Sequence, residues 1–120
     1  MASILAVDDS ASMRQMVSFT LKGAGYDVTE AKDGQEALQI AKTGKFNLVI
    51  TDINMPNMDG ITLISELRKL PEFKVTPLLM LTTESADDKK QAGKQAGATG
   101  WIVKPFNPDQ LLRVIRRALA

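Results

Sequence analysis

Six polar side chains stand at the ends of short apolar runs in this sequence. They are Asp8, Asp9, Asp52, Thr82, Thr83 and Lys104. Apolar runs of this length are typical of buried strands in a parallel sheet whose two faces are both covered by helices. Because the carboxyl ends of parallel strands share one edge of the sheet, where open α/β folds bind their ligands, we expect these side chains to converge.

The converging charges favour a divalent cation. Two carboxylates about 4 Å apart repel each other by roughly 4 kcal/mol at an effective dielectric constant of about 20, and Lys104 alone cannot offset three aspartates. The chain contains neither cysteine nor histidine, so its metal ligands would be oxygen atoms, which indicates Mg²⁺ or Mn²⁺ rather than zinc. Mg²⁺ usually binds one or two carboxylates together with phosphate oxygens, so a phosphoryl group is the expected ligand.

Asp52 is the candidate nucleophile for that phosphoryl group. No serine nucleophile and no histidine are in place at these strand ends, and Asp52 follows the run expected at the centre of the sheet. Lys104 and the metal would neutralise the charge of the transferred group. Positioning of the reacting groups would supply most of the remaining catalysis. Helix or loop capping could explain any one of these side chains, but it explains the whole set poorly. The set as a whole indicates formation of an aspartyl phosphate.

Five strand–helix units are predicted to position these residues. Strands are expected at residues 4–7, 27–31, 48–52, 78–81 and 100–103, and helices at 11–22, 34–44, 61–70, 86–96 and 108–119. Ser10, Asp33 and Asn107 are candidate N-caps, and Asp33 and Asn107 are followed by the Glu or Gln of a capping box. Right-handed crossovers then give an α/β, doubly wound parallel sheet with five helices on its two faces. In the order 2-1-3-4-5, strands 1, 3, 4 and 5 end side by side.

Length and composition predict one globular domain over residues 1–120, without an output domain. The net charge of +1 gives no electrostatic reason to expect nucleic acid as a partner, and the absence of cysteine excludes disulfides and thiol catalysis. No apolar stretch approaches the roughly 20 residues of a membrane span and no signal peptide is evident, so we expect a cytoplasmic protein without membrane insertion. Nothing in the sequence predicts a dimer, and we expect a monomer.

Four motifs, taken together and in order, closely resemble the receiver domain of two-component response regulators over essentially the full chain. They are Val7-Asp8-Asp9-Ser10, Asp52-Ile53-Asn54-Met55-Pro56 with Met58-Asp59-Gly60, Thr82, and Lys104-Pro105-Phe106. With Met13-Arg14 just after it, the first motif is similar to the single-domain chemotaxis regulators of the CheY type. The resemblance implies a flavodoxin-like fold and a phosphorylation-switched signalling protein, which is no enzyme beyond catalysing its own phosphorylation and dephosphorylation.

The resemblance also implies roles for the acidic residues and their neighbours. Asp52 would accept a phosphoryl group from a histidine of a chemotaxis-type histidine kinase. Asp9, Asp52 and the backbone carbonyl of Asn54 would bind Mg²⁺, with Asp8 helping through water. Asn54 and Glu84 stand at the positions that tune dephosphorylation and match the chemotaxis pair, so a short-lived phosphoryl state is expected, and a phosphatase would be a further partner.

The same resemblance assigns Thr82, Thr83 and Lys104 to the phosphoryl oxygens, and Thr82 with Trp101 to the conformational switch. Trp101 is a departure, because chemotaxis members of the family usually carry tyrosine at this position. An indole is larger and lacks the phenolic hydroxyl, so the inward swing typical of the family is expected to be altered. A half-exposed strand aromatic without a switching role is the alternative for Trp101.

Phosphorylation is expected to switch a face made by the fourth helix, fifth strand and fifth helix, with Lys94, Trp101 and Arg113, toward a flagellar motor or other signalling target. Two alternatives stay open. One is a phosphorelay intermediate that passes the phosphoryl group to another protein's histidine. The other is a small Mg²⁺-dependent phosphatase, but such enzymes usually carry a second aspartate two residues after the nucleophile, where this chain has Asn54.

The fourth helix carries no large apolar residue over residues 86–96. It can bury only alanine methyl groups, and Gly93 lowers helix stability by about 1 kcal/mol. The hypothesis is that this helix is the least stable element and shifts when Thr82 is drawn toward the phosphoryl group. A close-packed alanine face is the alternative.

Overall fold

Five short strands form one parallel sheet in the order β2-β1-β3-β4-β5, as predicted. The computed structural model describes residues 2–83 and 87–120. The strands are β1 Ser3–Val7, β2 Asp27–Ala31, β3 Leu48–Asp52, β4 Leu78–Thr83 and β5 Gly100–Lys104. β4 continues two residues beyond its predicted end, because Thr82 and Thr83 pair with Val103 and Lys104 of β5.

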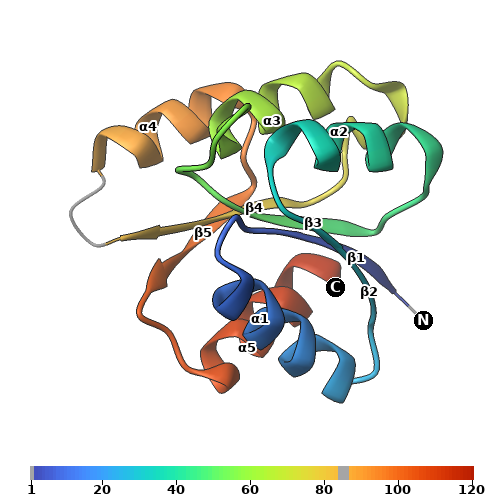
Figure 1. Cartoon of the computed structure of the whole chain (residues 1–120), viewed down its shortest axis with the longest axis vertical. Coiled ribbons are helices and arrows are strands. Elements are labelled where there is room, and N and C mark those ends of the chain that lie inside the picture. The colour runs from blue at the N-terminus through green and yellow to red at the C-terminus, as the bar shows by residue number, and fades with distance from the viewer. Residues whose placement is uncertain (1, 84–86) are drawn as a thin grey trace.

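Helices cover both faces of this sheet, which confirms the doubly wound architecture (Figure 1). The first layer holds α1 Ala11–Gly23 and α5 Pro108–Leu119. The second holds α2 Gly34–Thr43, α3 Gly60–Arg68 and α4 Asp87–Ala96, and a short 3₁₀ helix, η1 Pro71–Phe73, precedes β4. The predicted first residue of α4, Ala86, lies outside the described residues. Every helix in the described part of the chain is too short or too polar to span a lipid bilayer.

The helix caps explain where three of the helices begin. The side chains of Ser10, Asp33 and Asn107 each accept a hydrogen bond from a backbone N–H three residues on, as predicted. The capping box at α5 is also confirmed. At α2 the reciprocal bond differs from the prediction, because the Glu36 carboxylate accepts from the N–H of Lys32 at 3.0 Å instead of from Asp33.

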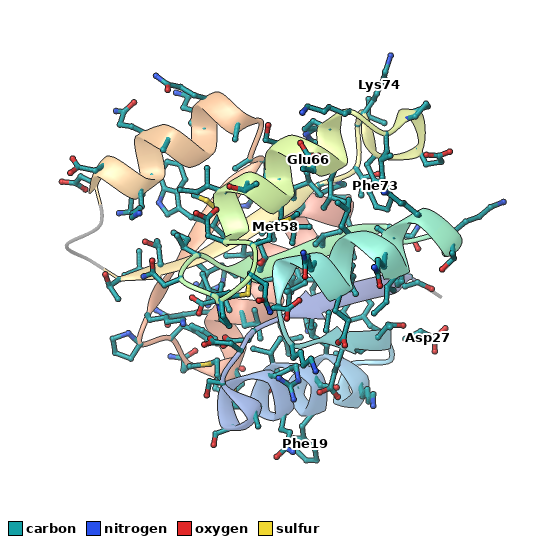
Figure 2. The ribbon with its side chains drawn as sticks, turned by 45° about the horizontal axis from the view of Figure 1, so that its top comes forward. Phe19, Asp27, Met58, Glu66, Phe73 and Lys74 are labelled. Atoms are coloured by element: carbon teal, nitrogen blue, oxygen red, sulfur yellow. The ribbon has the colours of Figure 1, made fainter. Side chains whose placement is uncertain are left out.

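Alternating residues of the central strands feed two apolar clusters, one on each face. Leu5 of β1 packs into the cluster under α2 and α3, and its neighbour Ile4 packs into the cluster under α1 and α5. This arrangement explains why the strands read as continuous apolar runs. Figure 2 shows Phe73 pointing into the molecule, where it is fully buried, and Phe19 projecting from α1 into solvent with 82% of its surface exposed.

Arg68 ties together several segments at the amino edge of the sheet. Its guanidinium donates to the carbonyls of Phe73, Thr76 and Gly97 at 2.6, 2.7 and 2.9 Å, and to the hydroxyl of Thr99 at 3.3 Å. These acceptors precede β4 or follow α4, so one side chain links the end of α3 to the entrances of β4 and β5. Arg68 therefore fixes the carboxyl end of α4 relative to the sheet.

Candidate functional site

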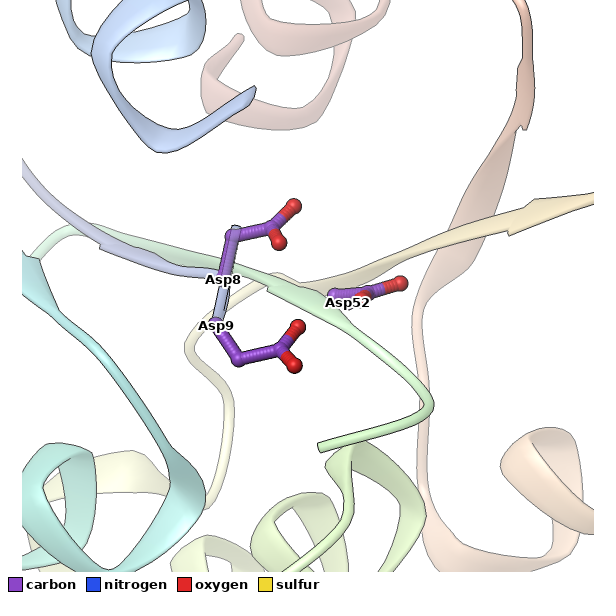
Figure 3. Close-up of side chains that lie close together, drawn as sticks. All are labelled: Asp8, Asp9 and Asp52. Carbon is purple, nitrogen blue, oxygen red and sulfur yellow. The ribbon is translucent and has the colours of Figure 1, made fainter. Parts of the chain in front are cut away.

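Asp8, Asp9 and Asp52 come together at the carboxyl edge of β1 and β3. One carboxylate oxygen from each lies within 4.8 Å of the other two. The parallel pairing of Val7 with Thr51 places the strand ends side by side, and Figure 3 shows the three carboxylates extending to the same side of them. The predicted convergence of the acidic residues is thus what the structure shows, while their roles remain predictions.

Lys104 reaches this acidic cluster from the end of β5. Its ammonium donates to Asp52 Oδ1 at 3.0 Å and lies 3.9 Å from Asp8 Oδ2. β4 separates β5 from β3 in the sheet, so the long lysine side chain passes the end of a strand to make this contact. One ammonium facing three carboxylates leaves the site with an excess of negative charge.

Asp8 is the most buried carboxylate of the cluster. Only 2% of the residue is exposed, and burial raises the pKa of its carboxyl group. The nearby Asp52 and Asp9 charges raise this pKa further, whereas the Ser10 N–H bond and Lys104 lower it. Asp8 Oδ1 accepts from the Ser10 N–H at 2.9 Å, but Asp8 Oδ2 has no hydrogen-bond partner among the described residues. A buried carboxylate oxygen without a partner is suited to a bound cation or its water.

A magnesium ion fits this donor set. The available ligands are carboxylate oxygens from Asp8, Asp9 and Asp52, and Asn54 lines the adjoining cleft. Mg²⁺ prefers oxygen ligands and tolerates retained waters, which suits a site where only one or two carboxylates bind directly. A divalent cation would provide a partner for the unpartnered oxygen of Asp8 and would offset the excess negative charge.

A small cleft opens between the end of β3 and the start of α4. It is lined by Asp52, Ile53, Asn54, Leu81, Thr82, Thr83, Lys89 and Lys104. The three residues predicted to contact the phosphoryl group, Thr82, Thr83 and Lys104, therefore share one cavity with the nucleophile candidate. Thr82 is buried, and its hydroxyl donates to the Thr83 carbonyl at 3.4 Å, a long bond that another acceptor could replace.

The structure gives a place in the site to two residues that had no assigned role, Lys89 and the motif residue Gly60. Lys89 lines the cleft from the first turn of α4, and only its position shortly after the fourth strand hinted at this. Gly60 lies so close to the backbone of Asp52 that a Cβ atom would overlap the Asp52 carbonyl. Its N–H donates to Ile53 at 2.8 Å, so the loop after β3 folds back against the strand end and holds Asp52 in place.

Trp101 stands apart from the cleft in this structure. It is 40% exposed on β5, and the ammonium of Lys90 lies 5.6 Å from the centre of its ring. This distance is within the range of a cation–π contact. Glu84, the second residue predicted to tune dephosphorylation, lies outside the described residues.

Comparison with known proteins gives a consistent family assignment. The family model described as the response regulator receiver domain matches residues 4–116. The chain is 45% identical to chemotaxis protein CheY-3 of Vibrio cholerae over 109 residues, covering 90% of this chain and 84% of that protein. It is 43% identical to a probable transcriptional regulator, ycf27, of Porphyridium aerugineum over 116 residues, but spans only 47% of that relative's length.

Solved structures share both the fold and the arrangement of elements. Chemotaxis response regulator CheY4 of Vibrio cholerae is 55% identical and superposes with a TM-score of 0.95 over 99% of both chains. The receiver domain of sensor histidine kinase PA1611 from Pseudomonas aeruginosa PAO1 has 26% identity and a TM-score of 0.91, over 98% of this chain and 97% of that one. That structure is described as having a magnesium ion coordinated in its active site cleft.

Proposed function

The chain belongs to the response regulator receiver family, and from this premise we propose that it is a stand-alone switch phosphorylated on Asp52 by a histidine kinase. The observation that carries the proposal is the position of Asp52. Its carboxylate ends the central strand, lies beside the other two carboxylates, and accepts a hydrogen bond from Lys104 at 3.0 Å. The residues proposed as nucleophile, metal ligands and cation for the phosphoryl oxygens thus lie at one edge of the sheet.

The proposed reaction is transfer of a phosphoryl group from a phosphohistidine to Asp52. A carboxylate oxygen of Asp52 forms a bond to phosphorus, the phosphorus–nitrogen bond breaks, and the electron pair returns to the imidazole of the kinase. Lys104 holds the attacking carboxylate and offers its ammonium to the transferred group. Mg²⁺ bound by Asp9, Asp52 and the carbonyl of Asn54, with Asp8 acting through water, would supply further positive charge to the phosphoryl oxygens.

The surface proposed to bind a target protein once Asp52 is phosphorylated consists of α4, β5 and α5. Trp101 lines shallow pockets with Lys94 on one side and Arg113 on the other, so all three predicted contact residues border one exposed region. In this proposal Thr82, which is buried near the end of β4, transmits a change in the cleft toward Trp101 on the neighbouring strand. The similarity to CheY-3 and CheY4 supports a chemotaxis or flagellar motor target, and the predicted cytoplasmic, monomeric state is part of the proposal.

Intact-mass spectrometry with acetyl phosphate and Mg²⁺ tests the nucleophile. Wild-type protein should gain a single phosphoryl group, and Asp52→Asn should gain none. Asp33→Asn is the matched control, because Asp33 is a buried aspartate at the same edge of the sheet that lies outside the acidic cluster. An adduct that persists in Asp52→Asn would overturn the assignment of Asp52.

Trp101 fluorescence tests whether the site communicates with the target face. Titration with Mg²⁺ followed by beryllofluoride should change the emission of wild-type protein but not of Asp52→Asn. A normal adduct with no change in emission would leave Asp52 as the acceptor and remove Trp101 from the switch. Passage of the phosphoryl group from Asp52 to a histidine phosphotransfer protein would instead support the phosphorelay alternative.

A further inference from the structure

We propose that Lys89, in the first turn of α4, is a second cation for the phosphoryl group on Asp52. This inference deepens the proposed function and rests on it. Lys89 shares the cleft with Asp52, Thr82 and Lys104, although it comes from a different element than any of them. Its ammonium can therefore approach a group built on Asp52 from the side of α4.

The charge change on phosphorylation gives Lys89 something to bind. Attack of Asp52 on acetyl phosphate forms a bond from carboxylate oxygen to phosphorus, and the bond to the acetyl oxygen breaks with its electron pair leaving as acetate. The singly charged carboxylate becomes an acyl phosphate with two negative charges at neutral pH. The cleft therefore gains one negative charge, whatever metal is bound. Lys104 is already within hydrogen-bond distance of Asp52 before this happens.

Of the three lysines of α4, Lys89 is the one that lines the cleft beside Asp52. Lys90 lies over the ring of Trp101, and Lys94 lines a separate pocket with Trp101 and Asp87. None of the ion pairs between described residues includes Lys89. The long, exposed side chain can therefore move toward new charge in the cleft without giving up a described ion pair.

The packing of α4 allows a contact between Lys89 and the phosphoryl group to move one end of the helix. Gly93 is the buried residue of the described helix, where it lies against the thioether of Met80, and the first turn is exposed. The other end is held through Gly97, whose carbonyl accepts from Arg68 at 2.9 Å. Attraction between Lys89 and the phosphoryl group would thus draw the exposed first turn of α4 toward the cleft while the carboxyl end stays fixed.

The test compares Lys89→Gln with Lys42→Gln, which removes the same charge from an exposed lysine of α2 outside the cleft. Rates of adduct formation with acetyl phosphate are measured by intact mass at physiological ionic strength, with Lys89→Arg as the charge-preserving variant. Lys89→Gln should react roughly three- to tenfold more slowly than wild type, as expected for loss of one nearby, partly screened charge. Lys89→Arg and Lys42→Gln should stay close to wild type.

A second readout separates an effect of charge from one of structure. The deficit of Lys89→Gln should widen at low salt and shrink at high salt, because screening weakens the lost interaction. Amide exchange in the first turn of α4 should slow on adding beryllofluoride to wild type but not to Lys89→Gln.

Equal rates for Lys89→Gln and Lys42→Gln, with a normal adduct on Asp52, would overturn the role of Lys89 and leave the proposed function intact. Failure of wild-type protein to form any adduct on Asp52 would overturn the proposed function itself. Both lysines are exposed, so neither substitution should impair folding, and thermal unfolding checks this.

Discussion

Asp8 and Arg68 are shielded charged groups at opposite edges of the same sheet, and their surroundings differ. Arg68 donates to three backbone carbonyls and one hydroxyl, and burial lowers the pKa of its guanidinium without providing a carboxylate partner. Asp8 lies beside two further carboxylates, with one oxygen lacking any described hydrogen-bond partner. The amino edge satisfies its charge within the chain, whereas the carboxyl edge leaves charge to be satisfied from outside.

This difference separates a structural charge from a functional one. A buried group whose partners all lie in the chain stabilises the fold, and a buried group without them destabilises it until a ligand binds. Asp33 shows that position alone does not decide the outcome. It is buried at the same edge as Asp8, but its carboxylate accepts from the Glu36 N–H and the Asn57 amide, each at 2.8 Å.

Arg68→Met should have the largest effect on stability. The substitution keeps most of the apolar stem but leaves the carbonyls of Phe73, Thr76 and Gly97 without their donor, which should lower the free energy of unfolding by roughly 3 kcal/mol. Urea denaturation measures the loss. Mg²⁺ affinity should stay at the wild-type value under conditions where the variant is folded, and a parallel loss of Mg²⁺ affinity would contradict the separation of the two edges.

Asp33→Ala should destabilise the protein by about 1–2 kcal/mol at pH 7, because α2 loses its N-cap. The Glu36 N–H and the Asn57 amide hold the pKa of Asp33 below the ordinary value of 3.8. The ionised carboxylate thus contributes its stability above about pH 4, and this contribution is lost as the pH falls through the lowered pKa.

Urea denaturation at pH 7 and at pH 3 checks the size and direction of this effect. Asp33→Asn is the control, because an asparagine retains an acceptor for the N–H but cannot titrate. A cost for Asp33→Ala that grows as the pH falls would show that the carboxylate is not stabilised as the hydrogen bonds indicate.

Asp8→Asn should have a smaller effect of the opposite sign, stabilising the metal-free protein by about 1 kcal/mol at pH 7. The amide keeps the acceptor for the Ser10 N–H but removes a charge that burial and Asp52 oppose. Because the folded-state pKa of Asp8 is raised, wild-type stability falls as the pH rises through that pKa, so the advantage of the variant should grow over the same interval.

Saturating Mg²⁺ provides a second comparison of wild-type protein with Asp8→Asn. The ion should stabilise wild-type protein more than Asp8→Asn, whose Mg²⁺ affinity we expect to be roughly tenfold weaker. Thermal unfolding with and without Mg²⁺ measures both effects. Destabilisation by Asp8→Asn in the absence of metal would mean that Asp8 belongs with Arg68 and Asp33 as a structural group.

The acidic cluster was predictable because its residues follow the central strands directly. Once the strand order is given, the ends of β1, β3 and β5 must lie near one another, so Asp8, Asp52 and Lys104 could be assigned from local sequence. The order itself is not written in any short stretch and came from the known class of doubly wound sheets.

Arg68 and Lys89 could not be predicted in the same way. The acceptors of Arg68 are scattered between residues 73 and 99 and follow no period, so nothing in the sequence distinguishes it from an ordinary basic residue at a helix end. The place of Lys89 in the cleft depends on how α4 lies on the sheet. That placement in turn depends on Gly93, which the sequence suggested was merely destabilising but which allows close contact with Met80.

The strand order also bears on how the chain is made. The three carboxylates lie at or before Asp52 and come from β1 and β3, whereas Lys104 ends the last strand. Because a nascent chain emerges from its amino end, the acidic cluster can form before Lys104, whose ammonium contacts it, has been synthesised. Addition of β5 therefore completes the sheet and at the same time offsets part of the repulsion among the three carboxylates. We expect ribosome-bound chains that stop short of Lys104 to fold better with Mg²⁺ than without it.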